Sequence, residues 1–282
     1  MPKTARGLNY VVTDLRPAWR RGKDSGRPVV FHHGVGASLE IFDEWVPIIA
    51  AHHPIVRFDM RGFGQSTVPS KAHDWTMREL VEDMLEVAQA AFGGEPVHAM
   101  GESIGGTIAL AATMRNPARF ASVAMSNAAI MGSRIGYAPG WREEIARVGI
   151  EGWSERLMEM RFVPGAVPPQ ARAWFSAQQA KSPAHVVVGL GEMLIGTDLT
   201  SELRELKAPV LLMMPDRSPF VTLAQASALT EIVPHAEVSV FPGARHGLPF
   251  SHAREAAGTL LDFLARVEGG RLPPSRAAGI GG

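Results

Sequence analysis

A serine lies at the centre of the stretch Gly101-Glu102-Ser103-Ile104-Gly105-Gly106. The apolar run 96–100 before it is typical of a buried strand, and the small residues 107–112 after it favour a helix. The stretch therefore predicts a strand, a sharp turn and a helix with the serine at the apex, which is the arrangement of a Gly-x-Ser-x-Gly nucleophile elbow. Its glycines let a strained turn approach the neighbouring strand and helix closely. A Gly-rich turn with a capping serine is the alternative, because the motif alone is a weak pattern.

Short apolar runs alternate with helical patterns along most of the chain. This alternation predicts an α/β fold with a mostly parallel sheet that helices cover on both faces. A more alternating segment, 7–15, predicts an antiparallel hairpin at the sheet edge. The expected strands are 28–32, 54–59, 96–100, 120–126, 209–214 and 236–241, and the expected helices are 38–51, 76–92, 103–115, 222–232 and 252–267.

The alternation stops between residues 128 and 206, where one helical pattern follows another. This region predicts a helical cap, 128–206, inserted into a core formed by residues 1–127 and 207–268. The tail 269–282 holds few apolar residues and is expected to be disordered. Most apolar cap residues must pack the cap, and most of its arginines are expected on solvated faces. The candidates to line an apolar substrate cleft are Trp141, Trp153, Met160 and Trp174.

The composition limits the classes of protein to which the chain can belong. Its 282 residues suit one large α/β domain, and the formal net charge of zero argues against a nucleic-acid partner. The absence of cysteine excludes disulfides, a thiol nucleophile and cysteine-ligated metals. The polar start has no signal core, and no apolar run approaches the roughly 18 residues of a membrane span. We therefore expect a cytoplasmic protein that acts on a small molecule and has no membrane partner.

His246 follows the last expected strand and precedes the closing amphipathic helix. A lone histidine is more often structural than catalytic. Its place after Ser103 in the chain, however, is the order in which a histidine base follows a nucleophile elbow. We therefore predict that His246 is the general base for Ser103. Other histidines, such as His98 inside a strand and His235 before one, fit this position less well.

The loop that follows the strand 28–32 is rich in small residues, up to residue 38. Small residues let a backbone approach a ligand, so this loop is a candidate to donate an N–H group to an oxyanion. By position the two donors are the amides of Val35 and of Ile104, the residue after the nucleophile. The loop lacks the lysine of a P-loop and the spacing of Gly-x-Gly-x-x-Gly, which argues against phosphate binding.

Four segments occur in the order and spacing of one large family: His33-Gly34, 59–66, 101–106 and 242–246. On these segments the chain resembles the α/β-hydrolase superfamily over about residues 7–268. The segment 125–129, followed by a short helical cap, is loosely similar to 3-oxoadipate enol-lactonases and related bacterial esterases. The resemblance implies an α/β-hydrolase fold, a serine nucleophile and hydrolysis of an ester or lactone without a metal or organic cofactor. In the family, the loop that holds Asp59 and Arg61 has a structural role.

The chain departs from the family at the third catalytic group. A histidine base needs a partner at its second ring nitrogen, which fixes the tautomer and stabilises the imidazolium. The family usually has an aspartate where this chain, aligned on Pro219, has Ser218. Asp216 is the preferred acid, although residues two apart in a strand lie about 6.6 Å apart, so that the backbone must bend. Ser218 is the first alternative, and the strand end near Asn127 is the second.

The predicted reaction is acyl transfer to water. Ser103 attacks the carbonyl group of a small, largely apolar substrate, and His246 accepts its proton. The amides of Val35 and Ile104 stabilise the oxyanion, and water resolves the acyl-enzyme. The alternatives are a C–C bond hydrolase or lyase on the same scaffold, and a ligand-binding protein with little turnover.

Overall fold

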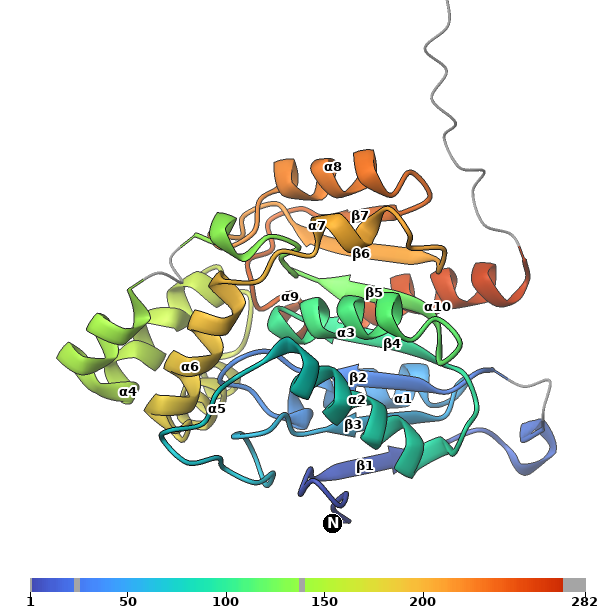
Figure 1. Ribbon diagram of the computed structural model, residues 1–282, viewed down its shortest axis with the longest axis horizontal. Coiled ribbons are helices and arrows are strands. Elements are labelled where there is room, and N and C mark those ends of the chain that lie inside the picture. The colour runs from blue at the N-terminus through green and yellow to red at the C-terminus, as the bar shows by residue number, and fades with distance from the viewer. Residues whose placement is uncertain (1, 23–25, 137–139, 271–282) are drawn as a thin grey trace, which may run out of the picture.

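The computed structural model describes residues 2–22, 26–136 and 140–270. Within these ranges seven strands form one sheet in the order β1-β3-β2-β4-β5-β6-β7 (Figure 1). All neighbouring strands run parallel except β1, which pairs antiparallel with β3. The strands are β1 (Tyr10–Thr13), β2 (Val29–His32), β3 (Ile55–Phe58), β4 (Val97–Glu102), β5 (Phe120–Ser126), β6 (Val210–Pro215) and β7 (Glu237–Phe241).

Helices cover both faces of this sheet (Figure 1). Successive side chains of a strand point to opposite faces, so Val30 joins the apolar cluster under α2, α3 and α8, while Val29 and Phe31 join the cluster under α1 and α10. The helices are η1 (Ala18–Arg20), η2 (Leu39–Trp45), α1 (Val46–Ile49), α2 (Met77–Phe92), α3 (Ile104–Arg115), η3 (Gly132–Arg134), α4 (Trp141–Arg161), α5 (Pro169–Ala180), α6 (Ala184–Ile195), α7 (Thr200–Leu203), α8 (Leu223–Ile232), α9 (Leu248–Ser251) and α10 (Ala253–Glu268).

The predicted fold class is confirmed, and most expected elements lie within a residue or two of their places. The expected helix 38–51 differs, because it is the 3₁₀ helix η2 followed by the single turn α1. Pro47 has no N–H to donate to the Asp43 carbonyl, which interrupts α-helical bonding at this point. The segment 7–15 forms the antiparallel edge strand β1, and its hairpin is reduced to one bridge between Lys3 and Asn9.

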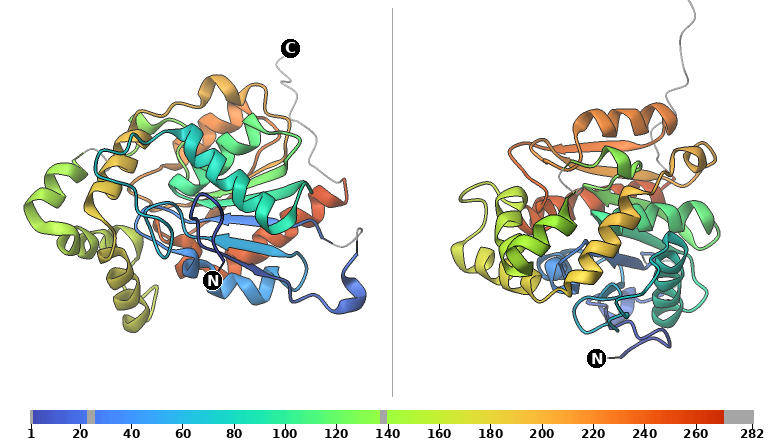
Figure 2. Two further views of the ribbon diagram at one scale, coloured as in Figure 1. Left: turned by 60° about the horizontal axis from the view of Figure 1, so that its bottom comes forward. Right: turned by 60° about the vertical axis from the view of Figure 1, so that its left-hand side comes forward.

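The region between β5 and β6 is a helical insert in which α4, α5 and α6 lie together beyond one end of the sheet (Figure 1; Figure 2). The non-helical backbone of Gly149, with φ at +72°, bends α4. The exact limits 128–206 of a cap domain stay a prediction. Apart from its first two residues, the tail 269–282 lies outside the described residues. Nowhere in the described ranges is a helix both long enough and apolar enough to span a bilayer.

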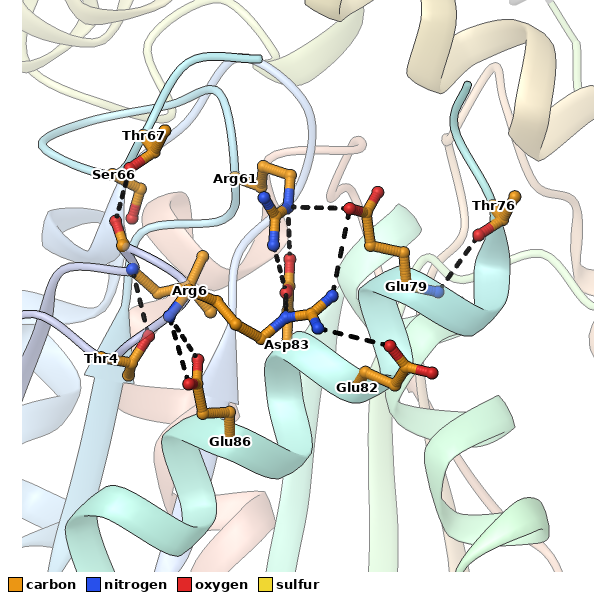
Figure 3. Close-up of polar contacts among 12 residues, drawn as sticks. Thr4, Arg6, Arg61, Ser66, Thr67, Thr76, Glu79, Glu82, Asp83 and Glu86 are labelled. Atoms are coloured by element: carbon orange, nitrogen blue, oxygen red, sulfur yellow. Dashed lines mark hydrogen bonds and ion pairs between the residues drawn. The ribbon is translucent and has the colours of Figure 1, made fainter. Parts of the chain in front are cut away.

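The loop 59–66 is fixed to its surroundings by ion pairs and hydrogen bonds. The Asp59 carboxylate accepts hydrogen bonds from the Leu39 and Gln65 amides, at 2.9 Å each. Figure 3 shows Arg61 next to Asp83 of α2, to which it donates two hydrogen bonds. These contacts agree with the structural role expected for Asp59 and Arg61.

Candidate active site

Ser103 occupies a strained turn between β4 and α3. Its φ of +56° lies in a region that residues with a Cβ rarely adopt. The flanking glycines are required by contact distances. A Cβ on Gly101 would lie 2.3 Å from the Gly105 carbonyl oxygen, and a Cβ on Gly105 would lie 2.4 Å from the His32 carbonyl oxygen. The expected strand, sharp turn and helix are therefore all present, with the serine at the apex.

The structure brings Ser103 and His246 together, although they are far apart in the sequence. The His246 Nε2 atom lies 3.1 Å from the Ser103 Oγ atom. His246 is buried, and its ring packs on Phe220 with 4.5 Å between the ring centroids. Burial, with a smaller contribution from the charge of Arg161, holds the pKa of His246 well below its ordinary value. His246 is therefore neutral near pH 7, as a general base must be.

The buried His33 holds the loop after β2. The Nε2 atom of His33 accepts a hydrogen bond from the Met60 amide at 2.8 Å, so its Nδ1–H donates to the Gly34 carbonyl, also at 2.8 Å. Burial lowers the pKa of His33, which keeps this arrangement neutral. The loop leads to Val35, which lines the same pocket as Ser103.

Ile104 is the first residue of α3 and also lines the pocket. The first N–H groups of a helix have no acceptor within the helix, so the Ile104 amide is available to a ligand. Val35 and Ile104 thus remain the candidate oxyanion donors, and both line the pocket that holds Ser103. The arrangement is suited to binding a negative oxygen next to the serine.

Neither predicted orienting residue reaches His246. Asp216 is exposed, and its Oδ1 atom accepts a hydrogen bond from the Gly243 amide at 2.7 Å. This bond holds the carboxylate at the turn after β7, so the bend that the sequence required does not occur. The Ser218 Oγ atom instead accepts hydrogen bonds from backbone amides of the next turn.

The second ring nitrogen of His246 is consequently unsatisfied. Its Nδ1 atom is buried and has no hydrogen-bond partner in the described part of the chain. Asn127, near the third predicted position, donates from Nδ2 to the His246 carbonyl oxygen at 3.0 Å. Asn127 therefore holds the backbone of the histidine loop rather than the ring. It adopts φ of +54°, so it is strained in the same sense as Ser103.

The buried glutamate next to Ser103 was not among the residues predicted from the sequence. Glu102, the last residue of β4, places Oε1 at 3.7 Å from the His246 Nε2 atom and 3.6 Å from the Arg161 Nη1 atom. Burial raises the pKa of Glu102 to about 7, although Arg161 and the nearby Gly34 amide favour its charged form. Neither carboxylate oxygen accepts a well-formed hydrogen bond from a described residue. The available signal was an acidic residue directly after the mainly apolar strand and before the serine.

Arg161, the last residue of α4, carries the positive charge of the site. Its Nη2 atom donates to the Val35 carbonyl oxygen at 2.8 Å, and its Nε atom donates to the Gln179 Oε1 atom at 2.9 Å. Its own carbonyl oxygen accepts a hydrogen bond from the Gly247 amide at 2.9 Å. Arg161, which is 4% exposed, is therefore an exception to the solvated faces expected for most of the cap arginines.

The pocket in front of Ser103 is mainly apolar. Of the four predicted lining residues only Trp141 reaches it, while Trp153 packs behind Trp141 with 5.3 Å between the ring centroids. Trp174 stacks on Phe250 elsewhere, and Met160 lies outside the lining. The apolar lining residues are Val35, Ile104, Ala129, Ile135, Trp141, Leu157, Leu194, Phe220 and Val221, and the polar ones are Ser103, Asn127, Arg161 and His246.

The described residues contain no group of three or more histidine, aspartate or glutamate side chains placed to hold a metal ion. The chemistry that the site offers is that of a serine, a neutral histidine and two candidate oxyanion amides at the wall of an apolar pocket. These are the parts that nucleophilic attack on a carbonyl group requires.

The α/β hydrolase fold family model matches residues 27–253, and the chain belongs to this family. It is 24% identical over 242 residues to 3-oxoadipate enol-lactonase 2 of Acinetobacter baylyi, covering 81% of this chain and 87% of that protein. It is 25% identical over 265 residues to the 2-hydroxymuconate semialdehyde hydrolase of Pseudomonas sp., covering 86% and 89%. The crystal structure of an enol-lactonase from Burkholderia xenovorans superimposes with a TM-score of 0.81 at 22% identity, covering 92% and 96%.

Proposed function

We propose that the protein is a serine hydrolase that cleaves a carboxylic ester or lactone of a small, largely apolar substrate through an acyl-enzyme. The observation that carries the proposal is the 3.1 Å contact between the Ser103 Oγ atom and the Nε2 atom of a buried, neutral His246. The strained backbone of Ser103 points this pair at an apolar pocket. A serine that merely capped a helix would need neither the histidine nor the pocket.

In the proposed reaction, the Ser103 Oγ atom bonds to the substrate carbonyl carbon while its proton passes to the His246 Nε2 atom. The Val35 and Ile104 amides donate to the oxygen on which negative charge develops. The tetrahedral intermediate then collapses, and His246 gives the proton to the leaving oxygen. Water attacks the acyl-enzyme by the same sequence of steps, which releases the acid and restores Ser103.

The nature of the substrate rests on the pocket and on the relatives. Nine of the thirteen lining residues are apolar, which favours a largely hydrocarbon acyl group. Two relatives are named as an enol-lactonase and as a semialdehyde hydrolase, and both act on small organic molecules by those names. A lactone or ester of modest size fits both lines of support.

A panel of p-nitrophenyl esters and lactones, with a fluorophosphonate probe of serine reactivity, tests the proposal. Wild-type protein is expected to turn over at least one panel member and to be labelled at Ser103. Ser103→Ala is expected to lose at least about 10³-fold in kcat/KM and all labelling, with an unchanged melting temperature. Appreciable turnover by Ser103→Ala, or no labelling of the wild type, would exclude Ser103 as the nucleophile.

A C–C bond hydrolase is the second candidate, favoured by the buried His246 Nδ1 atom that has no described partner. A histidine whose second ring nitrogen has no carboxylate partner is a weaker base than the histidine of a typical esterase. Product analysis in ¹⁸O-labelled water separates the candidates. Ester hydrolysis yields an alcohol and a labelled acid, whereas C–C hydrolysis yields a labelled acid and a fragment whose carbon is newly protonated. A lyase incorporates no label.

A further inference from the structure

Glu102 and Arg161 form a buried charge pair beside the nucleophile that the reaction as described does not use. Glu102 is 1% exposed and Arg161 is 4% exposed. Burying two charges is costly, and such a pair adds little stability compared with apolar residues of similar size. Because the pair adds little stability and Glu102 lies next to Ser103 and His246, we expect it to act in the reaction.

We propose that Glu102 is the charged partner of His246, and that its carboxylate stabilises the imidazolium that forms when Ser103 gives up its proton. This inference rests on the proposed hydrolase function and adds the positioning residue which that function lacks. It assigns to the residue before the nucleophile one part of the task that the sequence assigned to Asp216, the stabilisation of the imidazolium, and it leaves the Nδ1 atom without a described partner.

The geometry around the ring supports this assignment. Among the carboxylates of the described residues, Glu102 alone lies within 4.0 Å of a ring nitrogen of His246, at 3.7 Å. The other side of the ring is closed, because the Nδ1 atom is buried without a described partner and Phe220 covers the ring face. The positive charge that develops on the ring consequently meets a carboxylate only on its Nε2 side.

The surroundings of Glu102 keep it in place. The Arg161 guanidinium lies 3.6 Å from Oε1 and is itself fixed by the Val35 carbonyl and by Gln179. Gly34 leaves room for the carboxylate, since a Cβ at that position would lie 2.0 Å from the Glu102 Oε2 atom. With Arg161 on one side and His246 on the other, Glu102 faces one permanent positive charge and one that appears during the reaction.

The proton balance does not require Glu102 to take a proton. The proton moves from the Ser103 Oγ atom to the His246 Nε2 atom as the bond to carbon forms, and from Nε2 to the leaving oxygen as the acyl–oxygen bond breaks. Glu102 stays ionised throughout. In the transition state its charge offsets that of the imidazolium, while Val35 and Ile104 offset that of the oxyanion.

If Glu102 has this role, activity depends on the ionisation of its carboxyl group. The groups that face it are Arg161 from α4, His246 from the loop after β7 and the Gly34 amide, while His33 lies near Arg161. Burial lowers the pKa of both histidines, so they stay neutral around pH 7. Because the pKa of Glu102 is about 7, the rate should rise as the pH rises through that value.

The experiment measures, between pH 5.5 and 8.5, the rate constant of Ser103 labelling by a fluorophosphonate and the kcat/KM for p-nitrophenyl acetate. In the wild-type chain we expect both to rise through about pH 7. Glu102→Gln should lower both on the order of 10²-fold at pH 8 and abolish the rise. Glu102→Asp, which keeps the charge, should retain the rise.

A matched control breaks an exposed glutamate–arginine pair that does not line the pocket. Glu192 pairs with Arg142 at 2.7 Å on the exposed surface of the cap. Glu192→Gln should leave the labelling rate and its pH profile unchanged. If Glu102→Gln destabilises the chain by leaving Arg161 uncompensated, the double variant Glu102→Gln with Arg161→Met removes both charges. It should also lack the pH-dependent rise, and this pH profile is the readout because Arg161 also holds the Val35 carbonyl and its loss lowers the rate by itself.

A wild-type labelling rate that does not change between pH 6 and 8, or a folded Glu102→Gln variant that labels at the wild-type rate, would overturn the role of Glu102. Either result leaves the proposed function intact as long as Ser103→Ala abolishes labelling. Turnover by Ser103→Ala would instead remove the proposed function, and the role of Glu102 with it.

Discussion

At each end of β4 a glutamate lies close to a buried histidine. The two carboxylates differ in the hydrogen bonds that they accept. At the start of the strand, His98 donates from Nε2 to the Glu268 Oε1 atom at 3.3 Å, and the Arg27 amide donates to the same atom at 2.6 Å. At the other end, Glu102 lies near His246 but accepts no well-formed hydrogen bond from a described residue.

The pKa values of the two carboxyl groups record this difference. Burial works against the charge of Glu268, but the hydrogen bonds from His98 and Arg27, with the nearby His53, lower its pKa to about 2. Burial dominates at Glu102 and raises its pKa to about 7. A carboxylate whose oxygens are satisfied stabilises the fold, whereas one whose oxygens are left free is poised to respond to a new positive charge.

The largest expected effect comes from removing the cation that holds Glu102. Arg161→Gln leaves a buried carboxylate uncompensated and weakens the contact to the Val35 carbonyl oxygen. We expect a loss of about 3 kcal/mol in the free energy of unfolding, measured by urea denaturation, and a fall of at least about 10²-fold in kcat/KM.

Arg142→Gln provides the control for this substitution, because it breaks an exposed pair and should leave the free energy of unfolding nearly unchanged. If Arg161→Gln were as stable and as active as Arg142→Gln, the contrast between the two ends of β4 would not be electrostatic.

A smaller effect is expected at the satisfied end. The Glu268 side chain is 32% exposed, so solvent screens its contacts. Glu268→Gln should therefore lower the free energy of unfolding at pH 7 by only about 0.5–1 kcal/mol, with turnover unchanged. Because the pKa of Glu268 is depressed on folding, its contribution is present above about pH 4.5 and is lost as the pH falls through about 2.

The opposite sign is expected at Glu102, whose pKa is raised on folding. Its contribution to stability is greatest below about pH 4.5 and is lost as the pH rises through about 7. Denaturation of the wild type and Glu102→Gln between pH 5 and 8 measures this difference. If the free energy of unfolding of the wild type and of Glu102→Gln changed with pH in the same way, the pKa of Glu102 would not be raised on folding.

The smallest effect is expected at Asp216, a carboxylate that belongs to neither end of β4. It is exposed and holds only the Gly243 amide. Asp216→Asn should keep kcat/KM within about threefold of wild type, because an exposed side chain that does not touch His246 has little influence on its charge. A loss of 10²-fold or more would show that the loop moves to His246 during turnover and would restore the sequence-based assignment.

The strands, the elbow and the position of His246 were predictable because each is specified by a local pattern. Apolar runs with flanking helices define a parallel sheet, and a parallel sheet brings the loops at its carboxyl ends together. Ser103, His246, Val35 and Ile104 all follow strands or begin a helix at that end. Their convergence therefore follows from topology, without knowledge of any side-chain contact.

The orienting group and the pocket lining were not predictable in the same way. The Asp216 prediction assumed that the carboxylate nearest the family position would bend toward the histidine, but a backbone amide holds it at a turn. Arg161 looked like one of several solvated cap arginines, because helical spacing does not show which face the insert turns toward the core. Glu102 lay inside the most informative stretch, yet its role depends on Arg161 and His246, which arrive from distant segments.

The end of α4 is joined to the loops that hold Val35 and Gly247 by both the side chain and the backbone of Arg161. The side chain holds the Val35 carbonyl, and the main-chain carbonyl holds the Gly247 amide, next to His246. Lifting this end of the insert away from the sheet would break both contacts at once. The position of the end of α4 and the geometry of the loops that hold Val35 and Gly247 are therefore coupled through a single residue.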